Sequence, residues 1–269
     1  MKRGILLILC LGLIAAFTVG CGGGTAAGPD DNKVVVGATA KPHAEILEVA
    51  KPILEEKGIE LEIKVFTDYV QLNPALNDEQ IDANFFQHIP YLDDFNENND
   101  ANLEWVVKVH NEPMGVYSKN LAGLEDLPDN AKVGIPNDAT NGGRALNVLE
   151  AAGLIKLEAG AGVTATDKDI VENTKNLDII MMDAAMLPRS LEDLDICVIN
   201  SNYALEADLN PVDDSIFMEP KDSPFANVLV VRPDDKDREA IKALADVLQS
   251  PEIKAFLEEE YEGSCVPAF

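Results

Sequence analysis

Short apolar strands that alternate with amphipathic helices most narrowly limit the fold of this chain. The run KVVVGAT at residues 33–39 is continuous and apolar, as in a buried strand, and apolar residues recur at helical spacing through 42–58. In IELEIKVF, residues 59–66, apolar and charged residues alternate, which predicts a half-buried strand. Strand, helix and strand within about 35 residues form a βαβ unit.

The same alternation continues toward the C-terminus. Further strands are predicted at 131–136, 177–183, 195–201 and 226–233, and further helices at 141–153, 184–194, 234–250 and 251–261. This order indicates an α/β fold with parallel-rich sheets covered by helices. The chain is long enough for one large domain or two lobes. Because no long linker follows residue 32, two lobes would be joined by strands that cross between them.

The N-terminal segment, residues 1–20, has the pattern of an export signal. A basic start precedes an apolar run over 5–19, which is shorter than the ~20 residues of a membrane-spanning helix. Gly20 directly before Cys21 resembles the cleavage site of bacterial lipoproteins. We therefore expect lipid attachment at Cys21, a flexible tether over 21–32, and a mature protein held by its lipid outside the cytoplasmic membrane.

Charge and residue types argue against several classes of function. The chain has 48 Asp and Glu against 21 Lys and Arg, a formal charge of -27, which disfavours a nucleic acid or an anionic membrane surface as partner.

Cys197 and Cys265 could form a disulfide in an exported protein, but we expect two buried free thiols. The histidines lack metal-ligand spacing and no nucleophile motif is present, so we expect no enzyme, cofactor or metal.

Arg144 is a candidate anion-binding residue. It follows a loop with two glycines in PNDATNGGRALNVLE, and we expect it in the first turn of the next helix. A helix start offers unpaired amides, and a guanidinium can hold a carboxylate through two hydrogen bonds. A surface arginine on an amphipathic helix is the alternative.

Three asparagines are candidate polar contacts. Asn200, Asn202 and Asn227 lie at the ends of apolar strands, where ligands bind in open α/β sheets. One amide can accept from an ammonium and donate to a carboxylate. Loop asparagines that satisfy their own backbone are the alternative.

The stretch DANFFQHIPYL is a candidate aromatic wall. Phe85, Phe86, His88 and Tyr91 lie within seven residues, and Tyr69 lies a short distance upstream. In a strand, adjacent phenylalanines point in opposite directions, so only one of them need belong to the core. The rings would suit an apolar or sulfur-bearing side chain, since thioethers make favourable contacts with rings. Two core phenylalanines and a capping histidine are the alternative.

Several segments in order across residues 33–269 resemble the methionine-binding lipoproteins of the MetQ/NlpA type, the substrate-binding components of methionine ABC importers. The segments include DYVQLNPALNDEQIDANFFQHIPYL, PNDATNGGRALNVLEAAGLIKL, VINSNYALEADLNP and SPFANVLVV. The resemblance implies a two-lobed periplasmic-binding-protein fold of the second type, which closes over its ligand by hinge motion. Residues 33–113 with 230–269 would form one lobe and 114–229 the other.

The resemblance also implies the ligand and its contacts. Free methionine would lie with its side chain against Tyr69, Phe85, Phe86 and His88, and with its carboxylate and ammonium held by Arg144, Asn202 and Asn227. A monomer would deliver it to the permease and ATPase subunits of an importer. The choice between Asn200 and Asn202 stays open. So do two alternative functions: a protein of this fold that binds another apolar amino acid, a short peptide or a sulfur compound, and a surface-anchored adhesion or structural protein.

Overall fold

The computed structural model describes residues 32–219 and 224–269. The predicted signal peptide, the lipidation site Cys21 and the tether up to residue 31 lie outside the described residues. None of the helices in those two ranges combines the length and the apolar composition of a membrane-spanning segment.

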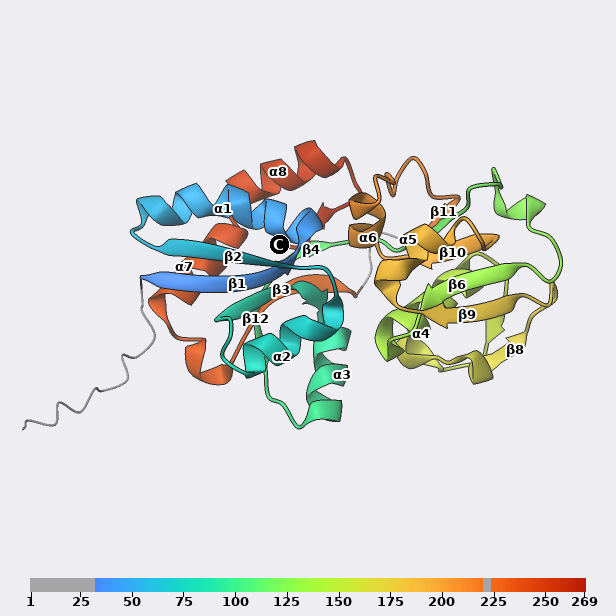
Figure 1. Ribbon diagram of the computed structural model, residues 1–269, viewed down its shortest axis with the longest axis horizontal. Helices are drawn as coiled ribbons and strands as arrows, with labels where there is room; N and C mark the ends of the chain where they lie inside the picture. The colour runs from blue at the N-terminus through green and yellow to red at the C-terminus, as the bar shows by residue number, and fades with distance from the viewer. Residues whose placement is uncertain (1–31, 220–223) are drawn as a thin grey trace, which may run out of the picture. The chain divides into compact units, whose positions relative to one another are not determined.

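Two β-sheets organise the chain (Figure 1). The first sheet has the strand order β13-β4-β12-β3-β1-β2 and the second has the order β11-β5-β10-β6-β9. The strands of the first sheet are β1 Lys33–Thr39, β2 Glu60–Phe66, β3 Ala83–His88, β4 Glu104–Asn111, β12 Ala226–Val231 and β13 Val266–Pro267. Those of the second are β5 Gly115–Tyr117, β6 Lys132–Pro136, β9 Asp178–Met182, β10 Ile196–Ile199 and β11 Phe217–Met218. A separate pair joins β7 Lys156–Leu157 to β8 Ile170–Glu172.

Helices cover both faces of the first sheet and pack on the second (Figure 1). One face of the first sheet carries α1 Glu45–Glu56, α7 Glu239–Leu248 and α8 Pro251–Tyr261, and the other carries α2 Leu72–Asn77 and α3 Ile89–Asn99. The second sheet is accompanied by α4 Ala139–Ala151, α5 Leu187–Ser190 and α6 Ser201–Glu206. Strand β12 serves both faces, because Leu229 and Val231 pack with α1 and α7 while Val228 and Val230 pack with α2 and α3.

The predicted βαβ unit is confirmed. Strands β1 and β2 pair in parallel, with α1 between them in the chain. The first sheet is mixed, however, because β12 and β4 run antiparallel to their neighbours. Strand β12 lies wholly in the first sheet, so the predicted lobe boundary at residue 229 falls inside a strand. Cys197 and Cys265 are buried free thiols, as predicted.

Over residues 32–219 and 224–269, the strand order leads from the first sheet to the second and back to the first. Residues 112–114, which we call the first crossing, connect β4 to β5, and the chain returns between β11 and β12. The Glu219 amide, directly after β11, donates to the carbonyl oxygen of Met114 at 2.8 Å. The start of the return path is therefore tied to the first crossing, beside the site described next.

Candidate ligand-binding site

A pocket of about 330 Å³ lies at the junction of the two sheets. Its walls come from the ends of β3 and β10, the first crossing, the start of β12, the first turns of α3 and α6, the first two turns of α4, and Tyr69 shortly before α2. The lining residues are Tyr69, Phe86, Gln87, His88, Tyr91, Glu112, Asn141, Arg144, Asn200, Ser201, Asn202 and Asn227.

The structure brings together all but one of the predicted contact residues. Tyr69, Phe86, His88, Arg144, Asn202 and Asn227 line the pocket, and Phe85 does not. The Phe85 ring is fully buried on the opposite face of β3, with its centroid 4.7 Å from that of His43 and 5.5 Å from that of His110. Placing Phe85 at the pocket was wrong, because alternation along the strand directs it into the core of the first lobe.

The two asparagines between which the sequence could not choose both line the pocket. Asn200 directly follows β10 and donates through Nδ2 to Asn141 Oδ1 at 2.8 Å, while Asn202 lies in the first turn of α6. Asn200 Oδ1 and Asn202 Nδ2 are buried and have no hydrogen-bond partner within the described ranges. Because an unpaired buried polar atom is costly, this free acceptor and free donor suit a ligand that offers both groups.

Arg144 is only 3% exposed and its guanidinium donates hydrogen bonds to two residues. It lies in the second turn of α4 rather than the first, because the helix begins at Ala139 with Asp138 as its cap. Its Nε and Nη2 donate to the Glu219 carboxylate at 3.1 and 2.5 Å, and Nη2 also donates to the Glu112 carbonyl oxygen at 2.7 Å. One side of the guanidinium is therefore already occupied by a protein carboxylate.

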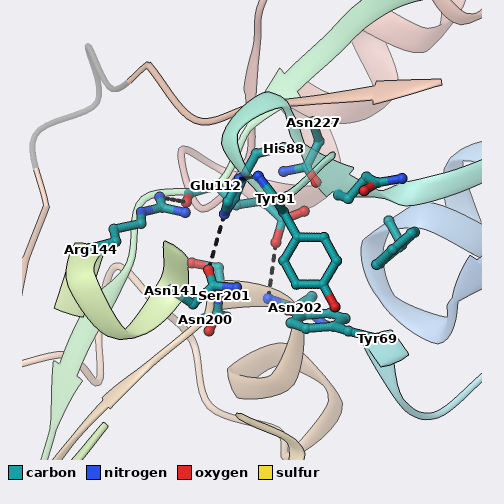
Figure 2. Close-up of a pocket in the computed structure, with 12 residues that line it drawn as sticks. Tyr69, His88, Tyr91, Glu112, Asn141, Arg144, Asn200, Ser201, Asn202 and Asn227 are labelled. Carbon is teal, nitrogen blue, oxygen red and sulfur yellow. Dashed lines mark hydrogen bonds between the residues drawn. The ribbon is translucent and has the colours of Figure 1, made fainter. Parts of the chain in front are cut away.

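Glu112 is a buried carboxylate that the sequence did not single out. Its Oε1 accepts from His110 Nε2 at 2.7 Å and lies 3.2 Å from His43 Nε2. Its Oε2 accepts from the backbone amide of Asn202 at 3.1 Å (Figure 2). Burial alone would raise the pKa of Glu112, but His43, His110 and Arg144 outweigh it and hold the pKa below its ordinary value. Glu112 therefore supplies a fixed negative charge at the pocket.

His43, His110 and Glu112 are far apart in sequence, yet their side chains meet and are of types that bind metals. A metal-bound histidine normally donates its second ring N–H to an acceptor. His110 Nδ1 is buried and has no such partner within the described chain. Hydrogen bonds account for the cluster better than a metal does, because His110 Nε2 donates to Glu112 Oε1 and His43 Nε2 donates to Asn227 Oδ1.

We call Glu112, Arg144, Asn200 and Asn202 the polar end of the pocket, and Tyr69, Phe86, His88 and Tyr91 its aromatic end. In the aromatic end, the Tyr69 and Phe86 ring centroids lie 5.7 Å apart, as do those of Phe86 and Tyr91. The Tyr69 hydroxyl donates to Asn202 Oδ1, which links the two ends. The rings also join an apolar cluster with side chains of the second sheet and its helices, including Leu187 and Ile199.

His88 is a neutral donor in this wall. Its Nδ1 accepts from the Tyr91 amide at 3.1 Å, so its proton is on Nε2, which donates to Asn141 Oδ1 at 3.1 Å (Figure 2). Burial, and to a smaller extent the charge of Arg144, lowers the pKa of His88 to about 3. His88 therefore caps α3 and also lines the pocket. The capping histidine and the aromatic-wall residue, which were alternatives in the sequence, are the same side chain.

Comparisons with known proteins identify the family. The sequence model of the family described as NlpA lipoprotein matches residues 34–269. The chain belongs to this family. A relative from Bacillus subtilis (strain 168), named methionine-binding lipoprotein MetQ, is 44% identical over 269 residues, covering 98% of this chain and 97% of the relative. A Salmonella typhimurium relative named D-methionine-binding lipoprotein MetQ is 42% identical over 240 residues, covering 88% and 89%.

A solved structure relates the family to the fold. A nutrient binding protein from Burkholderia cenocepacia bound to methionine superposes with a TM-score of 0.85 at 44% sequence identity, covering 88% of this chain and 100% of that one. The predicted two-lobed α/β binding-protein fold is therefore confirmed. Both relatives carry the names of binding proteins and not of enzymes.

Proposed function

We propose that this protein is a receptor that binds free methionine in the pocket between its lobes and delivers it to an ABC importer. One observation carries the proposal: a buried pocket with a cation and an anion at its polar end and aromatic rings at the other, in a chain 44% identical to a protein named for methionine binding. A methionine zwitterion has a carboxylate, an ammonium and a thioether, and each matches one of these features.

At the polar end, we assign the ligand carboxylate to Arg144 and the ammonium to Glu112, since buried opposite charges within contact distance stabilise each other. The unpaired Nδ2 of Asn202 suits the carboxylate and the unpaired Oδ1 of Asn200 suits the ammonium. Asn227 lines the same region, with its Oδ1 accepting from His43 Nε2 at 3.2 Å.

At the aromatic end, we assign the thioether to Tyr69, Phe86, His88 and Tyr91. Each sulfur–ring contact contributes about 0.3 to 1.5 kcal/mol. Tyr69, Phe86 and His88 precede the first crossing, whereas Arg144 and Asn202 follow it, so the ligand would touch both lobes. A ligand that touches both lobes favours the closed form, because it shifts a hinge equilibrium through its differential affinity for the two states.

The same proposal covers location and partners. Cleavage before Cys21 and its lipidation would hold the protein outside the cytoplasmic membrane, and a monomer would deliver its ligand to an importer made of permease and ATPase subunits. We take the first lobe as residues 33–113 with 226–269 and the second as 114–225, which moves the predicted boundary to the start of β12.

Thermal unfolding with and without amino acids tests the ligand. Protein is unfolded and refolded to strip bound molecules, then heated with L-methionine, D-methionine, other apolar amino acids and methionine-containing dipeptides. Ligand at 100 times its dissociation constant should stabilise the fold by ~2.7 kcal/mol. We expect a shift with at least one methionine enantiomer. A shift only with dipeptides would indicate a peptide receptor, and no shift with any compound would favour a structural or adhesion role.

Mass spectrometry of small molecules released from freshly purified protein provides an independent test. We expect methionine in near-stoichiometric amount. A different amino acid in its place would keep the fold and the charge assignments but change the ligand.

A further inference from the structure

Glu219 does not line the pocket, yet it makes the closest contact to the residue assigned to the ligand carboxylate. We propose that Glu219 is a positioning residue, which fixes the Arg144 guanidinium so that its Nη1 group faces the pocket and receives the carboxylate. This inference rests on the proposed function, because it takes the ligand to be an amino acid with a free carboxylate.

The hydrogen bonds of Arg144 leave one group for a ligand. A guanidinium has five N–H donors. The Nε hydrogen is used by Glu219, and the two Nη2 hydrogens are used by Glu219 and by the Glu112 carbonyl oxygen. Across residues 32–219 and 224–269, Nη1 makes no hydrogen bond, although Arg144 lines the pocket. A ligand carboxylate would therefore meet Nη1 and not the side that Glu219 occupies.

Glu219 is itself held rigidly. Its Oε2 accepts from the Met114 amide at 3.1 Å, and its own amide donates to the Met114 carbonyl oxygen at 2.8 Å. The Phe225 ring covers the guanidinium, with its centroid 4.2 Å from Arg144 Cζ. A side chain that is ordered before binding loses less conformational freedom when the ligand arrives. Glu219 therefore prepares Arg144 for binding.

These contacts join Arg144 to both paths between the lobes. Glu112 and Met114 belong to the first crossing, and Glu219 and Phe225 lie on the return path between β11 and β12. Arg144 itself is on α4 of the second lobe. The position of the guanidinium is thus set where the lobes meet, and a change at Glu219 displaces the charge that the ligand must reach.

The proposal makes a prediction opposite to that of simple electrostatics. If Glu219 acted only through its charge, removing that charge would leave Arg144 more positive and would tighten the binding of a carboxylate. If Glu219 acts by positioning, its loss frees the guanidinium and weakens binding. Glu219→Gln separates the two cases, since it removes the charge and one acceptor at nearly constant volume.

The test combines two measurements on ligand-stripped protein. The first is the ¹⁵N-detected Nε–H resonance of Arg144, identified by its loss in Arg144→Lys, and the second is a calorimetric titration with methionine. Glu219→Gln should broaden or shift the resonance and weaken methionine binding by at least tenfold. Glu219→Asp keeps the carboxylate on a shorter arm and should recover part of both effects. Glu192→Gln is the matched control, because Glu192 makes an exposed ion pair with Lys119, and it should change neither.

The outcomes separate this inference from the proposed function. Unchanged or tighter methionine binding by Glu219→Gln overturns the positioning role, and so does an unchanged Nε–H resonance. A parent protein that fails to bind methionine refutes the proposed function, and the resonance alone then decides whether Glu219 orders Arg144. If Glu219→Gln does not fold, Glu219→Asp carries both measurements, with intermediate loss expected.

Discussion

The two ends of the pocket are built in different ways. At the polar end, the Arg144 guanidinium donates to Glu219 and to the Glu112 carbonyl oxygen. The Glu112 carboxylate accepts from His110 and from the Asn202 backbone amide, and it lies 3.2 Å from His43 Nε2. At the aromatic end, the rings are placed mainly by packing, with single hydrogen bonds from Tyr69 and His88 across the pocket. A buried charge needs partners on every side, whereas a ring needs only a well-filled surrounding.

This difference predicts how the ends respond to change. Removing a charge from the polar end leaves its partners buried and unpaired, so the loss exceeds that of one contact. Trimming the Phe86 ring at the aromatic end removes apolar contact and leaves no unpaired group, because phenylalanine has no polar side-chain atom. We therefore expect steep losses of affinity at the polar end and graded losses at the aromatic end.

The steepest loss is expected for Arg144→Ala. Charged hydrogen bonds contribute about 1.5 to 3 kcal/mol each, so methionine affinity should fall by about 100-fold or more. The free energy of unfolding should fall as well, by about 3 to 5 kcal/mol, because Glu219 keeps a buried charge without its partner. Calorimetric titration and denaturant unfolding of stripped protein measure the two losses.

Arg189→Ala is the control, since Arg189 is an exposed arginine of α5. It should leave both quantities unchanged. If Arg144→Ala bound methionine as well as the parent, the carboxylate assignment would be wrong.

A somewhat smaller loss is expected for Glu112→Gln. The amide oxygen can still accept from His110, but the negative charge that faces the ammonium is gone, so affinity should fall by about 10- to 100-fold. A methionine analogue without the amino group should bind Glu112→Gln no worse than it binds the parent. Equal losses for methionine and for that analogue would show that Glu112 does not contact the ammonium.

The sequence predicts the elements whose periodicity is plain, and it misses those that break it. Strand β3 is buried at every position although it contains Asn84 and Gln87, because Gln87 Nε2 donates to Asn84 Oδ1 at 2.9 Å and to Asn73 Oδ1 at 2.6 Å. When buried polar side chains form hydrogen bonds with one another, the strand that carries them shows neither an alternating pattern nor a continuous apolar run in the sequence. Only the fold shows that these amides pair.

The site was predictable where a residue type is rare and hidden where it is common. Arg144 was found because it is an arginine after a glycine loop in an acidic chain. Glu112 and Glu219 were missed because 48 acidic residues make any one of them unremarkable in sequence. Their roles depend on the two crossings meeting in space, which no local pattern records.

Acid should destabilise the protein through histidines at both ends. Burial lowers the pKa of His43, beside Glu112, to about 4 and that of His88 to about 3. Below pH 6.5 the unfolded chain takes up protons on both rings while the folded protein does not, so the free energy of unfolding falls as pH decreases. At pH 5.0 the loss should reach about 2 kcal/mol for each histidine, relative to pH 7.5.

Denaturant unfolding across this pH range measures the effect, and His88→Gln assigns the aromatic end's part of it. Between pH 6.5 and 5.0, the free energy of unfolding should depend less steeply on pH in the variant than in the parent. The difference in slope should correspond to about one proton. The same slope in variant and parent would mean that His88 titrates normally in the folded state.

The smallest effects should come from the adjacent phenylalanines of β3, which separate pocket from core within one strand. Phe86→Leu should weaken methionine binding by about three- to tenfold, because one ring leaves the thioether's surroundings. Phe85→Leu should lower the free energy of unfolding by about 1 kcal/mol and leave affinity within twofold, because Phe85 packs behind the pocket against His43 and His110. Titration and unfolding of both variants test this assignment. If Phe85→Leu weakened binding as much as Phe86→Leu, the core behind β3 would be part of the site. The two phenylalanines would then not separate the aromatic end of the pocket from the core.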